Sequence, residues 1–166
     1  MVALIIAELL IIEMLEAIPT DFFSTNFRLE QESQLVGELG PSMWRCKATL
    51  ELEDGTYNLY REKFLSGDYL LEHNGTIIAR ASKLNVFRDK FAVQVGNRLV
   101  ELRKLRWATR KFGLFDGETQ LGAIYPKGLF TKRATIDLPT EWPIANRVFM
   151  FWLAFLMWKR DSQAAS

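Results

Sequence analysis

The sequence predicts a mainly β protein: a closed antiparallel barrel of about eleven or twelve strands around a hydrophobic C-terminal helix. Three observations predict it. A unit of about 43 residues occurs three times, apolar and polar residues alternate at period two inside each unit, and an unbroken apolar run, Val148–Trp158, lies near the carboxyl end. The 166 residues can bury the core of one domain. A β-trefoil, which also has three four-stranded units, is the alternative fold.

The first nineteen residues are almost wholly apolar apart from Glu8, Glu13 and Glu16. They have neither the positive start nor the small-residue cleavage site of a secretory signal, and a membrane span would bury carboxylates at high cost. Two interpretations stay open. Residues 1–19 form an amphipathic helix docked on the domain, or the start is over-extended and the protein begins near Met14. Either way, the barrel domain is expected to cover residues 20–160.

The repeat is clearest in Met43–Lys47, Val86–Lys90 and Leu129–Arg133, which each read aliphatic, aromatic, polar, any residue, basic. An alternating stretch follows each copy, as half-buried strands require. Its matching apolar positions are Ala48, Leu50 and Leu52, then Phe91, Val93 and Val95, then Ala134, Ile136 and Leu138.

Hairpin turns separate the predicted strands. Asn74-Gly75 and Asp116-Gly117 are strong turn signals between the first and second strands of units two and three. Each complete unit therefore has four short strands. The third unit is expected to lose its last strand, because the chain becomes helical after Leu138.

That helix is predicted over residues 141–160, with Thr140 as its cap, Pro143 in its first turn and a disordered tail at 161–166. Its apolar run is apolar on every side, so either protein or lipid must surround it. Eleven residues span only about 16 Å, against roughly 30 Å of hydrocarbon. A helix buried inside the barrel is therefore favoured over a membrane anchor.

Charge is segregated along the chain although the net charge is only +1. Residues 1–79 carry 5 basic and 13 acidic side chains, whereas residues 80–133 carry 13 basic and 4 acidic ones. Such asymmetry suggests a surface for an anionic partner. The alternative is that the two halves neutralise each other across the folded barrel.

The basic segments supply the candidate binding residues. Residues 103–111, between units two and three, hold five positive charges and a tryptophan, and the two later repeat signatures add further cations. Basic side chains around an aromatic suit anionic headgroups, although the signature aromatics also fit a core role. The candidate ligand-binding residues are Arg103, Lys104, Arg106, Trp107, Arg110, Lys111, Lys83, Arg88, Lys132 and Arg133.

The sequence offers no pattern typical of an active site. His73 is the only histidine and is expected to be exposed at a hairpin tip, and Cys46 is the only cysteine, so neither a zinc site nor a catalytic triad can be assembled. No phosphate-binding glycine loop is present. We expect no catalytic residues, no metal and no cofactor.

A barrel of repeated hairpins, a strand ending in Asp137-Leu138-Pro139 and a helix around Phe151–Leu153 resemble the tubby C-terminal-like superfamily. That group includes tubby proteins, phospholipid scramblases and LURP-one-related proteins, and the layout is similar to small uncharacterised bacterial members. The resemblance covers roughly Phe22 to Arg160. It implies a non-enzymatic domain that often works at membranes. Scramblases carry a calcium-binding segment and palmitoylated cysteines, which this chain does not match, so lipid scrambling is not expected.

These observations lead to one main hypothesis and three rivals. The main hypothesis is a cytoplasmic, non-catalytic domain, peripheral at a membrane, that meets anionic phospholipid through its basic face. A protein partner could occupy the same face. Nucleic-acid binding ranks lower, because few exposed aromatics can be assigned for base stacking. A small apolar ligand inside the barrel ranks last, since a barrel filled by a helix leaves no room for it.

Overall fold

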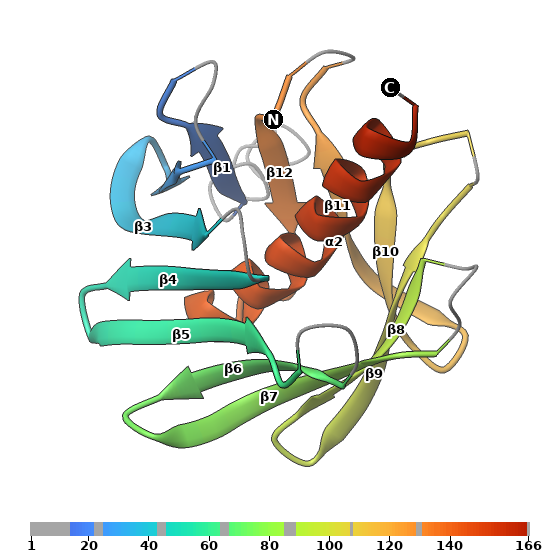
Figure 1. Cartoon of the computed structure of the whole chain (residues 1–166), viewed down its shortest axis with the longest axis horizontal. Helices are drawn as coiled ribbons and strands as arrows, with labels where there is room; N and C mark the ends of the chain where they lie inside the picture. Colours follow the sequence, from blue (N-terminus) through green and yellow to red (C-terminus); the bar gives the residue numbers. More distant parts are fainter. Residues whose placement is uncertain are drawn as a thin grey trace, which may run out of the picture.

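A computed structural model describes residues 14–21, 25–42, 46–63, 67–84, 89–106, 108–128 and 131–165 of the chain (Figure 1). These residues form twelve strands and one helix. The strands are β1 Leu15–Pro19, β2 Phe27–Gln31, β3 Gln34–Ser42, β4 Lys47–Leu52, β5 Gly55–Arg61, β6 Tyr69–His73, β7 Thr76–Lys83, β8 Lys90–Val95, β9 Arg98–Lys104, β10 Phe112–Asp116, β11 Thr119–Pro126 and β12 Ala134–Asp137, and the helix is α2, Ile144–Ala164.

The twelve strands form one closed antiparallel barrel in the order β1-β12-β11-β10-β9-β8-β7-β6-β5-β4-β3-β2. Neighbours in sequence are neighbours in the barrel, and β1 closes it by pairing with both β2 and β12. The helix α2 runs through the interior (Figure 1). The predicted fold class, a closed barrel around a C-terminal helix, is therefore confirmed, and the β-trefoil alternative is wrong.

The threefold repeat is visible in the strand register. The first hairpin of each unit, β2–β3, β6–β7 and β10–β11, has an irregularity directly after Leu29, Leu71 and Leu114, respectively. A bulge at this point bends each hairpin in the same way. The alternating apolar residues that the repeat predicted to face inward, from Ala48 to Leu138, are all buried or half-buried.

Strand β1 corrects the prediction for the amino-terminal segment. A helix over residues 1–19 is wrong for its last five residues, because Leu15–Pro19 is a barrel strand with Leu15 and Ala17 fully buried. The alternative, a start near Met14, concerns residues 1–13 and stays a prediction. Strand β1 fills the place that the third unit leaves empty after β12, because the chain turns into α2 there. The barrel therefore begins at residue 15 instead of 20. Residues 1–13, including Glu8 and Glu13, lie outside the described part of the chain.

The helix also differs from its prediction at both ends. It begins at Ile144 and not at residue 141, and Pro143 occupies the N-cap position without a side-chain cap, so Thr140 does not cap it. Proline has a φ suited to a helix start and lacks the N–H that would need a partner there. The expected disordered tail at 161–166 is wrong up to Ala164, because the helix continues through these residues.

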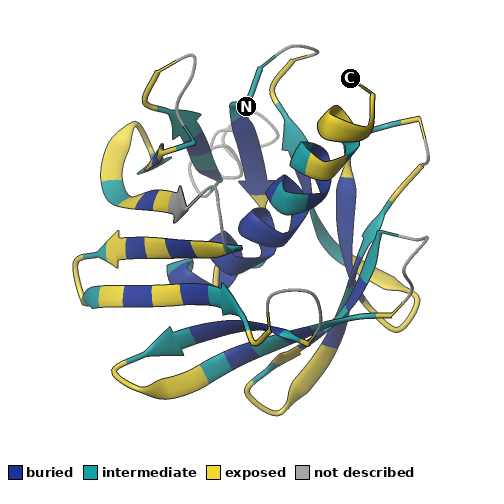
Figure 2. Cartoon of the chain, viewed as in Figure 1, coloured by how far each residue is buried: buried dark blue, intermediate teal, exposed yellow. Residues whose placement is uncertain are grey.

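The core consists of α2 and the inward faces of the strands (Figure 2). Every residue from Ala145 to Phe155 is buried, so the helix is enclosed on all sides, as its apolar run predicted. Trp152 is inaccessible to solvent and meets Tyr69 edge-to-face at 5.9 Å between ring centroids. Phe27 makes the same kind of contact with Phe151 and Phe155. No helix in the described ranges is long and apolar enough to cross a bilayer.

Ion pairs hold β1, the strand that closes the barrel. Glu16 on β1 accepts hydrogen bonds from Lys127 and from Arg133, whose Nε lies 3.1 Å away, so β1 is tied to the connection between β11 and β12. Burial acts to raise the pKa of Glu16, but the two cations outweigh it and the pKa is lowered. The ionised form of Glu16 therefore stabilises the folded barrel.

We predict that Glu16→Gln lowers the free energy of unfolding at neutral pH by about 1 kcal/mol, since both cations are partly exposed and screened. A lowered folded-state pKa adds stability above the ordinary glutamate pKa and loses it as the pH falls. The difference between wild type and variant in urea unfolding should therefore shrink below about pH 4.5. Glu30→Gln, on the neighbouring strand and paired with Arg28 alone among the described residues, is the control. A difference that does not change with pH would contradict the role of the Glu16 charge.

Candidate functional site

The two ends of the barrel are built differently. All the tight turns, between β2 and β3, β4 and β5, β6 and β7, β8 and β9, and β10 and β11, lie at the end where α2 begins. The longer connections lie at the opposite end, where α2 terminates, because strand direction alternates around an antiparallel barrel. The first end carries mostly carboxylates and the second mostly cations, so we call them the acidic end and the basic end.

Charge also separates along the barrel axis. In the described turns, the strand ends beside them and the β12–α2 connection, the acidic end has seven carboxylates and one cation: Glu32, Glu53, Asp54, Asp116, Glu118, Asp137 and Glu141, with Arg98. The described connections and strand ends of the basic end, together with the end of α2, hold fourteen cations and five carboxylates: Lys47, Arg61, Lys63, Lys83, Lys90, Lys104, Arg106, Arg110, Lys111, Lys127, Lys132, Arg133, Lys159 and Arg160, with Asp21, Glu62, Asp68, Asp89 and Asp161. The described residues of the basic end therefore carry an excess of positive charge, which attracts anions.

The structure brings the described candidate residues together at the basic end, but several of them are held by internal partners. Arg103 pairs with Glu101 at 2.9 Å and covers the ring of Phe115 at 3.8 Å. Arg133 pairs with Glu16. Lys132 also interacts with another group of the protein. Trp107 and Arg88 lie outside the described residues.

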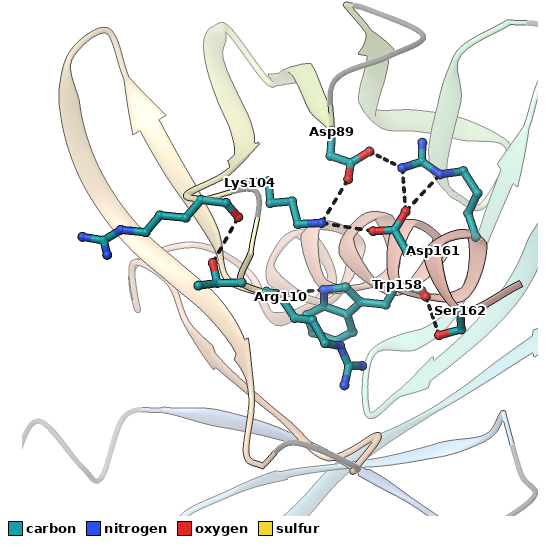
Figure 3. Close-up of polar contacts among 9 residues, drawn as sticks. Asp89, Lys104, Arg110, Trp158, Asp161 and Ser162 are labelled. Carbon is teal, nitrogen blue, oxygen red and sulfur yellow. Dashed lines mark hydrogen bonds and ion pairs between the residues drawn. The ribbon is translucent and has the colours of Figure 1, made fainter. Parts of the chain in front are cut away.

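Lys104 belongs to an ion-pair network that anchors the end of α2 (Figure 3). Its ammonium lies 3.1 Å from Asp161 on the helix and 3.7 Å from Asp89. Arg160 contacts both of the same carboxylates, at 2.8 and 2.6 Å. Burial acts to raise the pKa of Asp161, but the two cations lower it overall. Lys104 and Arg160 are therefore largely neutralised inside the protein.

Arg110 and Lys111 lie against aromatic rings, the first on α2 and the second on β11. The guanidinium of Arg110 is 4.9 Å from the ring centre of Trp158, and the indole nitrogen donates a 2.8 Å hydrogen bond to the carbonyl of Arg110 (Figure 3). Lys111 covers Tyr125 at 5.3 Å and is exposed. Burial lowers the pKa of Lys83, and the positive charge of Arg160 adds to this effect. Lys83 is half-buried and thus less available to a partner.

The described candidates most open to a ligand are Arg106 and Lys111. Both side chains are exposed, and neither forms an ion pair with a described carboxylate. Two large apolar side chains are exposed at the same end, Leu84 at 53% and Leu105 at 37%. Leu84 follows β7 and Leu105 follows β9, so sequence reasoning, which concentrated on charge, missed both. Cations next to exposed leucines can contact a surface that is both anionic and apolar.

His73 is half-buried, which corrects the exposed position expected for it. Its ring stacks on Tyr57 with centroids 4.1 Å apart, while Nδ1 faces the carbonyl of Thr56 at 3.1 Å and Nε2 faces the amide of Asn74. A neutral ring protonated on Nδ1 satisfies both neighbours. The hydroxyl of Tyr57 donates to Asp54, and burial together with this bond raises the pKa of Tyr57 to about 12. These groups hold two hairpin turns together.

The part of the chain that the structure describes contains no group of three or more His, Cys, Asp or Glu side chains that could hold a metal ion. Comparison of the chain with models of known protein families, with curated proteins and with solved structures gave no match.

Proposed function

We propose that this protein is a non-catalytic, cytoplasmic binding domain that lies at an anionic phospholipid surface with its basic end toward the headgroups. The observation that carries the proposal is the separation of charge along the barrel axis, with fourteen described cations against five carboxylates at one end. Electrostatic attraction is worth about 1 kcal/mol for each Lys or Arg near such a surface. Glu16, Asp89 and Asp161 reduce the effective number.

Two further features support a membrane surface over a purely ionic partner. Leu84 and Leu105 are exposed beside the cations, so their side chains can enter the region below the headgroups. A barrel threaded by a C-terminal helix is also the layout that made the sequence resemble the tubby C-terminal-like superfamily, whose members often work at membranes. Membership of that superfamily is part of the proposal.

Vesicle flotation tests the proposal, with Arg106→Glu as the variant. The protein should float with vesicles that contain phosphatidylserine and should not float with pure phosphatidylcholine. Reversing one charge should weaken binding to the anionic vesicles about tenfold or more, since two charge units are lost. Arg98→Glu changes the net charge equally at the acidic end, where Arg98 forms an ion pair with Asp116, and should bind like wild type.

Equal binding to neutral and anionic vesicles, or equal losses in the two variants, would contradict the proposal. Single-stranded RNA added at moderate salt separates the nucleic-acid rival. RNA that displaces the protein from anionic vesicles at low concentration would favour nucleic acid as the partner. If the protein binds neither anionic vesicles nor single-stranded RNA, the membrane proposal is wrong and a protein partner for the basic end is favoured.

A further inference from the structure

A wide groove opens at the acidic end, on the side opposite the proposed membrane contact. It has a volume of about 1030 Å³ and lies where β3, β4 and the turn after β4 meet the start of α2. Its apolar part is formed by Leu35, Val36, Leu52 and Ile144. Leu35 is 58% exposed. An exposed apolar groove of this kind is a typical docking surface.

Four carboxylates line the same groove: Glu38, Glu51, Glu53 and Asp54. Glu51 accepts a hydrogen bond from Thr56 and Asp54 accepts one from Tyr57, but none of the four forms an ion pair among the described residues. Most carboxylates elsewhere in the described strands do so, including Glu16, Glu30, Glu101 and Asp116. The groove thus presents negative charge that the fold does not neutralise.

The strand register places two of these carboxylates directly opposite each other. Glu38 on β3 is the cross-strand partner of Glu51 on β4, and like charges in this position destabilise a sheet. Arg28 lies across from Glu38 on β2, but its guanidinium pairs with Glu30 at 3.3 Å.

Two other like-charge pairs in the barrel are compensated. Glu16 and Glu30 face each other on β1 and β2, and each has its own cation. Lys90 and Arg103 face each other on β8 and β9, and Glu101 pairs with both. The pair at the groove is the exception in the described sheet, because no described cation forms an ion pair with either carboxylate.

We propose that this groove binds a polypeptide segment of a partner protein in which Lys or Arg residues alternate with apolar residues. The cations would pair with Glu38, Glu51 and Glu53, and the apolar side chains would lie on Leu35 and Leu52. A segment fits better than a single ion, since the carboxylates are spread along two strands and a turn. The proposal does not depend on the membrane function, although a basic end on a membrane would leave the groove facing away from it.

A fluorescent nine-residue peptide of alternating Lys and Leu is the probe, and its anisotropy is measured with the full chain. Peptides of alternating Lys and Ser and of alternating Glu and Leu are the comparison probes. The Lys–Leu peptide should bind at least tenfold more tightly than either, because only it offers both cations and apolar side chains. The triple variant E38Q/E51Q/E53Q should weaken its binding at least tenfold.

The control variant is E32Q/E118Q/E141Q, which removes the same charge from the same end but outside the groove. It should bind the Lys–Leu peptide like wild type. The groove variant should melt at the same temperature as wild type or higher, since the Glu38–Glu51 repulsion is gone, and its binding to anionic vesicles should be unchanged. Equal losses in the two variants, or equal binding of the Lys–Ser peptide, would overturn the proposal.

Discussion

Trp152→Ala should remove a large part of the stability of the barrel. Trp152 is inaccessible to solvent at the middle of α2, where it meets Tyr69 edge-to-face and stacks near Phe149. Replacing a buried tryptophan with alanine costs about 3 to 5 kcal/mol, because contacts are lost and a cavity remains. Total stabilities of domains are only about 5 to 15 kcal/mol. Thermal unfolding followed by circular dichroism should show a midpoint lowered by about 10 °C or more.

Trp152→Phe is the matched control for this experiment. The indole nitrogen of Trp152 is buried and donates no hydrogen bond to a described residue, so phenylalanine removes volume without breaking a hydrogen bond. It should cost clearly less than alanine. If both variants unfold within about 2 °C of wild type, α2 is not the core around which the strands close. The peripheral-membrane proposal would then lose its structural basis as well, because an unpacked apolar helix would be free to enter lipid.

Most of the barrel was predictable because local patterns in the sequence report directly on strand faces. The alternation at Ala48, Leu50 and Leu52, repeated twice at the same spacing, fixed both the strands and the number of units. Strand β1 was not predictable in this way. Its five residues lie in a longer apolar run, and its partners Gln31 and Ile136 are remote from each other in sequence.

The candidate site was predictable in composition but not in its electrostatics. The sequence shows acidic and basic halves, whereas the barrel sorts charge between its ends, because successive connections alternate from one end to the other. The partners that neutralise candidate cations are also distant in sequence. Lys104 pairs with Asp161 and Arg133 pairs with Glu16, and only the closed barrel brings these residues together. Arg106 and Lys111 therefore emerge as the binding residues to test first.

Gly122→Ala should destabilise the barrel although it adds a single methyl group. A Cβ at this position would lie 2.2 Å from the carbonyl oxygen of Asp137 and 3.1 Å from the Cα of Leu138. Both contacts are with backbone, so no side chain can move aside. The short strand β12 would have to shift, and it is held between β11 and β1. Overpacking of this kind costs about 1 to 3 kcal/mol, and displaced strand pairing adds to it.

Gly40→Ala, on β3 in the first unit, provides a control of opposite sign. A Cβ on Gly40 would lie 3.6 Å from its nearest neighbour, the side chain of Asn26, which is ordinary contact. Alanine there restricts the unfolded chain and should stabilise the protein by about 0.5 kcal/mol. The two variants differ from wild type by the same chemical group, so urea unfolding should separate them by about 2 kcal/mol or more. Equal stabilities would mean that β12 does not lie against β11 at Gly122, and that the barrel is not closed between these two strands.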